Sequence, residues 1–160
     1  MAESSQPERA LPLTPSQVLE RLPQQEPFRF IDEIRELDSE HIVASYRFDE
    51  GADFYRGHFP GNPITPGVIL VESMAQAGVV ALGIYLCALE LSSEELEKLV
   101  TVFTDADVEF TGSVRPGDRV VTTGRKVFFR RRKLRAEVEM KLADGTLVCS
   151  GVLSGMGVPR

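Results

Sequence analysis

His58 is the side chain of this sequence best suited to move a proton near neutral pH. It is one of only two histidines, and it opens a segment stiffened by Pro60, Pro63 and Pro66. Proline restricts the backbone, so the position of the His58 ring should be well defined. An imidazole can accept a proton at neutral pH, and general acid–base help is worth about 10²–10⁴-fold in rate. A lone loop histidine is more often structural than catalytic; the other histidine, His41, is predicted to be a surface residue where a strand begins.

Glu72 is the second candidate, because it stands within a strongly apolar run that predicts a buried helix. Burial disfavours the charged carboxylate, so we expect the pKa of Glu72 to be raised. A protonated carboxyl can donate a hydrogen to a departing hydroxyl. Gln76 follows four residues later, hence on the same helix face, and can hydrogen-bond and orient the carboxyl. The alternative is a buried glutamate that a neighbouring base or amide satisfies without any chemistry.

The start of this helix predicts a site for a negatively charged oxygen. Thr65 suits the N-cap and Pro66 the first helical position, which places Gly67 and Val68 in the first turn. Backbone N–H groups there lack helical partners and share the positive end of the helix dipole. Such donors suit the enolate-like oxygen of a thioester, and losing one oxyanion donor typically costs roughly 2.7–4 kcal/mol in the transition state. The alternative is a glycine that simply fits a tight corner.

A base, an anion site and an acid thus fall within fifteen residues, 58–72. Elimination of water from a 3-hydroxyacyl thioester needs these three groups. One removes the α-proton, one stabilises the oxyanion, and one protonates the leaving hydroxyl.

The elements that must position these groups follow from the periodicity of the sequence. The long apolar helix spans about 67–89, and alternating apolar residues predict strands before and after it. Short helices are predicted near 14–22 and 92–95, and the strands at 28–37, 41–48, 99–110, 120–129, 134–142 and 146–156. A helix that is apolar on all sides must be covered, and a strongly curved antiparallel sheet wrapped around it does so. We therefore expect an α+β fold with one domain over 14–158, preceded by a frayed tail at 1–13.

Composition narrows the classes of partner. A net charge of −6 argues against nucleic acid, which requires a basic surface. A membrane span is disfavoured because Glu72 lies inside the apolar segment, where a carboxylate is costly. Cys87 and Cys149 form no motif, and with no secretory signal recognised, we expect a reduced cytoplasmic setting.

Three segments of the sequence resemble one enzyme family. The stretch GHFPGNPITPGVILVESMAQAG, residues 57–78, closely resembles the signature of FabZ-type 3-hydroxyacyl-[acyl-carrier-protein] dehydratases. The similarity extends to LPQQEPFRFIDEIRELD at 22–38 and VEFTGSVRPGDRV at 108–120, and together covers about 18–158. Glu72 followed by Met74-Ala75-Gln76 resembles the FabZ type rather than the FabA type, which has Asp and then Trp-Gln there. Dehydration without double-bond isomerisation is therefore expected.

The resemblance implies a hot-dog fold and a dimer in which His58 of one subunit works with Glu72 of the other; trimers of dimers are common in the family. It implies neither a metal nor an organic cofactor, and an acyl carrier protein as the partner. By position, Gly67 would supply the oxyanion amide and Gln76 would support Glu72. Two departures leave room for a specialised pathway: Thr65 replaces a hydrophobic residue, often Met, and Gln24-Gln25 replaces the common His-Arg.

A basic run stands out in this acidic chain, with seven Lys or Arg residues in the eleven positions 125–135. It is either a solvated hairpin turn or a docking patch for an acidic carrier protein, centred on Arg130, Arg131, Arg132 and Lys133.

Two other functions stay open on the sequence alone. One is an acyl-thioester hydrolase of the same fold, which would need a group that activates water. The other is a non-catalytic accessory subunit that binds acyl thioesters.

Overall fold

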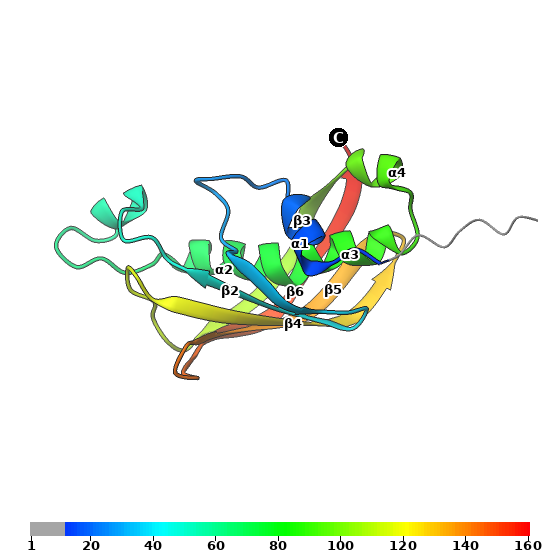
Figure 1. The fold of residues 1–160 in the computed structure, drawn as a ribbon. Helices are drawn as coiled ribbons and strands as arrows, with labels where there is room; N and C mark the ends of the chain where they lie inside the picture. Colours follow the sequence, from blue (N-terminus) through cyan, green and yellow to red (C-terminus); the bar gives the residue numbers. More distant parts are fainter. Residues whose placement is uncertain (1–11) are drawn as a thin grey trace, which may run out of the picture.

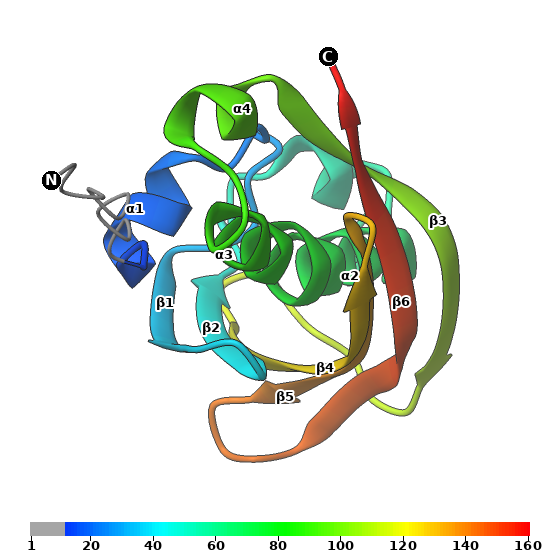
Figure 2. The same ribbon diagram turned by 90° about the vertical axis from the view of Figure 1, so that its right-hand side faces the viewer.

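A single antiparallel sheet curves around one long helix in the computed structural model, which describes residues 12–160. Figure 2 looks along this helix and shows the sheet surrounding it on several sides. The strands are β1 (Glu33–Leu37), β2 (His41–Arg47), β3 (Leu99–Phe110), β4 (Arg119–Arg130), β5 (Lys133–Leu142) and β6 (Leu147–Pro159). This is the α+β hot-dog arrangement that the sequence predicted. The tail expected at 1–13 falls mostly outside the described residues, although Leu13 packs against the core.

The order of strands in the sheet is β1-β2-β4-β5-β6-β3, with every neighbouring pair antiparallel. β4, β5 and β6 follow one another through hairpins, and Gly145 takes a positive φ of 92° in the β5–β6 turn. β3 instead pairs along its whole length with the end of the chain, β6. β1 and β3 are therefore the two edges of the sheet.

The central helix consists of α2 (Gly67–Ala75), a π-helical turn η2 (Gln76–Ala81) and α3 (Leu82–Ala88), which run on without a break. By length and composition these 22 residues could cross a membrane, yet two-thirds of the apolar window is buried inside the fold. Close packing on the sheet depends on two glycines: a Cβ on Gly124 of β4 would stand 2.8 Å from the Cα of Gly78. The helix is thus the core element that its apolar composition predicted.

Two short helices lie where the sequence predicted them, and each follows a capping residue. α1 (Pro15–Glu20) starts after Thr14, which forms a reciprocal capping box with Gln17. α4 (Ser93–Glu97) starts after Ser92, which forms the same motif with Glu95. Local hydrogen bonds of this kind involve only nearby residues, which is why the sequence alone reveals them.

The first predicted strand is shorter than expected. Residues 28–31 are not in the sheet, and β1 begins only at Glu33. The backbone around Phe30 is hydrogen-bonded instead to side chains of the central helix, with the Phe30 N–H donating to Gln76 Oε1 at 2.7 Å. A strand pattern in the sequence does not reveal such a competing partner from 46 residues away.

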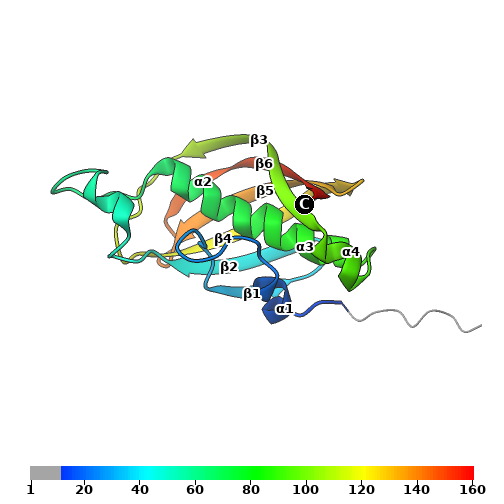
Figure 3. The same cartoon turned by 90° about the horizontal axis from the view of Figure 1, so that it is seen from above.

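The segment between β2 and the central helix projects beyond the rest of the molecule. It contains the short 3₁₀ helix η1 (Asp53–Arg56), and Figures 1 and 3 both show it extending past the start of α2. His58 lies in this projecting segment, two residues after the end of η1. The predicted base is therefore carried by a loop that reaches away from the body of its own subunit.

Candidate active site

The backbone of Ile64 holds His58 at two points. The Ile64 N–H donates to the His58 carbonyl at 3.0 Å, and Nδ1 of the His58 ring lies 2.8 Å from the Ile64 carbonyl oxygen. A carbonyl oxygen can only accept, so Nδ1 carries the hydrogen in this contact. In a neutral imidazole Nε2 then keeps its lone pair. The half-buried ring is thus held in the tautomer that a general base requires.

The helix start differs in one respect from the prediction. Pro66 occupies the N-cap and Gly67 begins α2, and the cap makes no side-chain hydrogen bond. Thr65 is not the cap: its hydroxyl lies 2.6 Å from the hydroxyl of Tyr55. The prediction was wrong because a buried tyrosine from an earlier turn offers Thr65 a partner that capping rules do not consider.

The first amides of the helix differ in their hydrogen bonding. The N–H groups of Ile69 and Leu70 donate to the Pro66 carbonyl, whereas no hydrogen bond from the Gly67 or Val68 N–H is found within residues 12–160. Both amides stand at the positive end of a long helix. A Cβ on Gly67 would lie 3.3 Å from ring carbons of Phe110. Packing against that ring is enough to explain the glycine, so a role in binding an oxyanion remains a proposal.

Glu72 lies in the second turn of α2, but its side chain is half-buried in the single chain rather than fully buried as expected. Gln76, which is fully buried, donates from Nε2 to Glu72 Oε1 at 2.9 Å and to the Phe28 carbonyl at 2.8 Å. The contact expected from the four-residue spacing is therefore present. Because Oε1 acts as an acceptor, a proton on this carboxyl resides on Oε2. Gln76 thus fixes which oxygen of Glu72 can act as an acid.

His58 and Glu72 do not meet in the single chain. No hydrogen bond joins them in the described part of the molecule; their polar contacts there are with Ile64 and Gln76, respectively. One rests on the projecting loop and the other on the central helix (Figure 3). The residues that the sequence grouped by proximity therefore belong to separate parts of one subunit.

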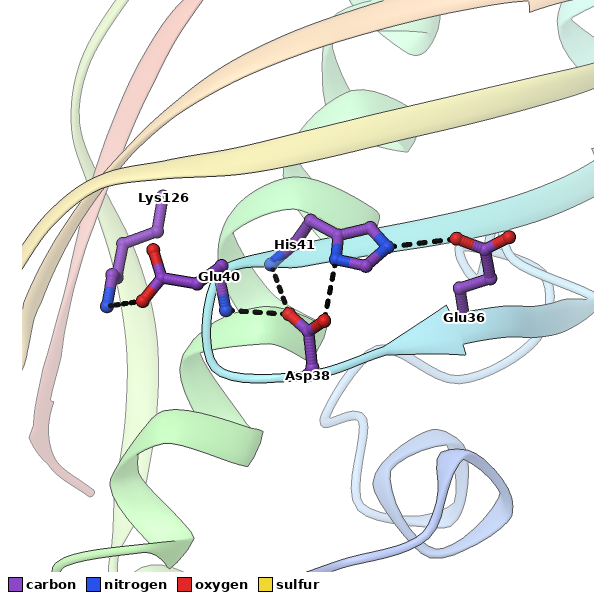
Figure 4. A network of polar contacts seen from close by, with 5 residues as sticks. All are labelled: Glu36, Asp38, Glu40, His41 and Lys126. Atoms are coloured by element: carbon purple, nitrogen blue, oxygen red, sulfur yellow. Dashed lines mark hydrogen bonds and ion pairs between the residues drawn. The ribbon is translucent and has the colours of Figure 1, made fainter.

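His41 stands between two carboxylates on the β1–β2 hairpin (Figure 4). Its Nε2 lies 2.9 Å from Glu36 Oε2 and its Nδ1 lies 2.9 Å from Asp38 Oδ2. Only the protonated ring can donate to both, and the hydrogen bond to Glu36, followed by that to Asp38, raises the pKa of His41. An ion pair between Glu40 and Lys126 completes the network drawn in Figure 4.

The contribution of His41 to stability is expected to depend on pH. Its pKa is higher in the folded protein, so the stabilisation is complete below the ordinary pKa of histidine and is lost as pH rises through the raised value. Urea unfolding between about pH 5.5 and 8.5 should show His41→Gln losing most relative to wild type at the acidic end. Lys126→Gln removes a nearby ion pair with Glu40 but no imidazole, and should lower stability evenly across this range. A pH-independent loss in His41→Gln would contradict the prediction.

The basic run forms the β4–β5 hairpin, with Arg131 and Arg132 at its tip. Both have positive φ values, 51° and 63°, as the two central residues of a tight turn. The turn lies beside α3, at the opposite end of the central helix from Gly67 (Figures 1 and 3). Arg132 is also hydrogen-bonded through its carbonyl to the Gly157 N–H of β6. Within one subunit the predicted docking patch is thus remote from Glu72.

A cavity of about 750 Å³, which no sequence pattern had indicated, lies at this same end of the molecule. Its walls come from α1, α3, α4, β3, β5 and β6, and include Gly83, Cys87, Arg132 and Arg160. Burial raises the pKa of the Cys87 thiol to about 11, so it stays protonated and is a poor nucleophile. A cavity assembled from so many separate elements has no signature in any one segment.

The contacts of Tyr55 and Phe110 were also missed by the sequence. Tyr55 is buried in η1 beside Thr65, and the Phe110 ring lies over Gly67 from the end of β3. Neither residue lies in a recognisable spacing with its partner. In residues 12–160, no group of three or more His, Cys, Asp or Glu side chains is close enough to hold a metal ion.

Comparison with known proteins identifies the family. Residues 22–153 match the family model described as a FabA-like domain. The chain is 39% identical over 141 residues to the 3-hydroxyacyl-[acyl-carrier-protein] dehydratase FabZ of Streptococcus equi subsp. zooepidemicus, covering 86% of this chain and 93% of that protein. It is 38% identical over 136 residues to the FabZ of Streptococcus pyogenes, covering 83% and 90%.

Solved structures agree on the fold. The dehydratase heterocomplex ApeI:P from Xenorhabdus doucetiae aligns with a TM-score of 0.71 at 16% identity, over 92% of this chain and 93% of that one. A thioesterase from Haemophilus influenzae aligns with a TM-score of 0.64 at 16% identity, over 92% of each. Since dehydratases and thioesterases share this architecture, the fold alone does not choose between them. The family match and the sequence identity do: the chain belongs to the FabZ-type 3-hydroxyacyl-[acyl-carrier-protein] dehydratases.

Proposed function

We propose that this dehydratase acts in fatty acid or related lipid synthesis with His58 as its base and Glu72 as its acid. The observation that carries the assignment is the contact between His58 Nδ1 and the Ile64 carbonyl, which leaves Nε2 as the acceptor. Gln76 has the corresponding role for the acid: it donates a hydrogen bond to Oε1 of Glu72, which leaves Oε2 to carry the proton. The two groups are prepared for opposite directions of proton transfer.

Each catalytic group has one task in the dehydration. Nε2 of His58 takes the proton from the carbon next to the thioester, and negative charge develops on the thioester oxygen. The amides of Gly67 and Val68 donate hydrogen bonds to that oxygen. Glu72 Oε2 gives its proton to the 3-hydroxyl, which leaves as water while the carbon–carbon double bond forms. His58 then holds one extra proton and Glu72 lacks one, so exchange with solvent restores the starting state.

A complete site on this proposal needs two subunits, with His58 from one and Glu72 from the other. The projecting loop supports this, because it carries His58 away from its own body (Figure 1). The sheet supports it too: β3 is a twelve-residue edge strand with exposed Val102, Phe103 and Phe110. Long, apolar edge strands tend to pair with another strand, and a second copy of β3 would pair here. Particle mass in solution distinguishes this dimer from a trimer of dimers.

The proposed partner is an acyl carrier protein, and the proposed docking surface is the β4–β5 hairpin with Arg130, Arg131, Arg132 and Lys133. Arg131 and Arg132 are exposed, and Arg160 brings a further guanidinium to the cavity that Arg132 lines. The single chain places this surface away from its own Glu72, so the carrier must reach a site that the partner subunit helps to form. A cytoplasmic location is part of the proposal; Cys87 and Cys149 are both free and buried.

Charge reversal tests the docking surface. Arg131→Glu with Arg132→Glu should raise KM for carrier-bound substrate about tenfold at low salt and less at high salt, because steering by exposed charges is screened. The same variant should act normally on a small thioester that lacks the carrier. Arg35→Glu, an exposed reversal on β1, is the matched control. An unchanged KM for the carrier-bound substrate would remove the hairpin from the proposal.

The activity itself is tested by incubating the purified protein with 3-hydroxyacyl carrier proteins of several chain lengths. Formation of trans-2-enoyl product is the expected result. Release of free thiol without enoyl product would identify a hydrolase instead. Binding of the acyl thioester without turnover would identify an accessory subunit.

A further inference from the structure

We propose that the hydrogen bond between the Tyr55 and Thr65 hydroxyls is a positioning device that fixes the His58 loop on the start of the central helix. The two oxygens are 2.6 Å apart, and the residues are only 6% and 3% exposed. Tyr55 and Thr65 are the first and last residues of the segment 55–65, which we call the His58 loop. This inference rests on the proposed function, because it concerns how the base is held for catalysis.

Both ends of the bond are also held by backbone hydrogen bonds. Tyr55 is part of η1, and its backbone N–H donates to the Ala52 carbonyl. The Thr65 N–H donates to the carbonyl of the fully buried Val114 at 2.8 Å, and Thr65 stands two residues before Gly67. The side-chain bond therefore joins η1 directly to the segment that leads into α2.

The bond acts on His58 through Ile64. Ile64 directly precedes Thr65, and its carbonyl and N–H make two of the contacts that hold His58; the third is from the His58 N–H to the Phe54 carbonyl in η1. A shift of Thr65 relative to η1 must move this carbonyl relative to the imidazole. The position of the His58 ring relative to the start of α2 thus depends on the separation of Tyr55 from Thr65.

The hydrogen bond between the two hydroxyls explains why position 65 has a threonine. A hydrophobic side chain at this position could fill the same space but could not fix a direction, whereas a hydrogen bond sets both distance and angle. Burial raises the pKa of Tyr55, so its hydroxyl stays protonated during turnover. Thr65 replaces the hydrophobic residue that is usual at this position, and its hydroxyl has a hydrogen-bond partner in the hydroxyl of Tyr55.

Two isosteric variants and their combination test the role. Tyr55→Phe and Thr65→Val each leave one buried hydroxyl without a partner, so each should lower Tm. Each should also lower kcat about tenfold while KM stays within about twofold, because misplacing a catalytic group affects the transition state most. In the double variant neither hydroxyl is left, so Tm should recover. Its kcat should stay about tenfold low, because the link between η1 and the helix start is still missing.

Thr122→Val is the matched control. It makes the same change at a buried threonine of β4, for whose hydroxyl no hydrogen bond is found within residues 12–160, and should leave kcat unchanged. With only two histidines in the chain, ¹⁵N NMR of the imidazoles gives a second readout. The Nδ1–H signal of His58 should be that of a fixed hydrogen bond in wild type and in Thr122→Val, and should be averaged in the double variant.

The outcomes separate positioning from simple burial. Recovery of wild-type kcat in the double variant would show that the pair only satisfies buried polar groups, and would overturn the inference. Unchanged kcat in both single variants would overturn it as well. If wild type forms no enoyl product from any 3-hydroxyacyl carrier protein, the proposed function fails and this inference fails with it.

Discussion

Replacing His58 with alanine should lower kcat by about 10²–10⁴-fold, the range typical for losing a general acid or base. The hydrogen bond from Nδ1 to the Ile64 carbonyl presents Nε2 as an acceptor, and no other side chain of the 55–65 loop is an imidazole or a carboxylate. Enoyl formation from a carrier-bound substrate measures the loss. Circular dichroism and particle mass should match wild type, because the ring makes only one polar contact within residues 12–160.

His41→Ala is the control for this loss. It removes the other imidazole of the chain, which binds two carboxylates on the β1–β2 hairpin. Its kcat should stay close to that of wild type at neutral pH. Equal activity of His58→Ala and His41→Ala would remove His58 from the mechanism.

Replacing Glu72 with glutamine should cost a similar factor, about 10²–10⁴-fold in kcat. Glutamine has nearly the same shape, and its carbonyl oxygen can still accept the hydrogen bond that Gln76 Nε2 donates at 2.9 Å. Its amide cannot release a proton to a leaving hydroxyl, so only the acid function is removed. Glu90→Gln, the same change at an exposed position beyond α3, should keep wild-type activity. Retained turnover in Glu72→Gln would mean that another group protonates the hydroxyl.

Mixing the two inactive variants tests whether the site is shared between subunits. In a dimer of one His58→Ala subunit and one Glu72→Gln subunit, one site has lost both groups and the other has kept both. Random association makes half of the dimers mixed, so co-expression should restore about a quarter of wild-type activity. If each subunit carried its own complete site, mixing would restore nothing, and the two-subunit site would have to be abandoned.

Some features of the site could be predicted from the sequence because they depend on short spacings. Gln76 contacts Glu72 because residues four apart share a helix face. Gly67 begins a helix because Pro66 has no N–H and its ring clashes with a preceding helical turn, so the helix can start only at this point. The capping motifs of α1 and α4 follow from the same kind of local rule. Spacing did not reveal that Thr65 pairs with Tyr55, because ten residues of irregular loop can bring many pairs together.

The sequence by itself determined the elements: a buried helix, hairpins and strands, with an acid and a base flanking the helix start. These come from capping, turn chemistry and periodicity, whose energies depend on neighbours along the chain. Only the tertiary structure decided the order of the strands, with β3 beside β6. It also detached residues 28–31 from the sheet, and it put the arginine turn at the far end of the helix from Gly67. These follow from packing and hydrogen bonds between residues distant in the chain, such as Phe30 with Gln76, whose strength depends on how all the elements meet at once.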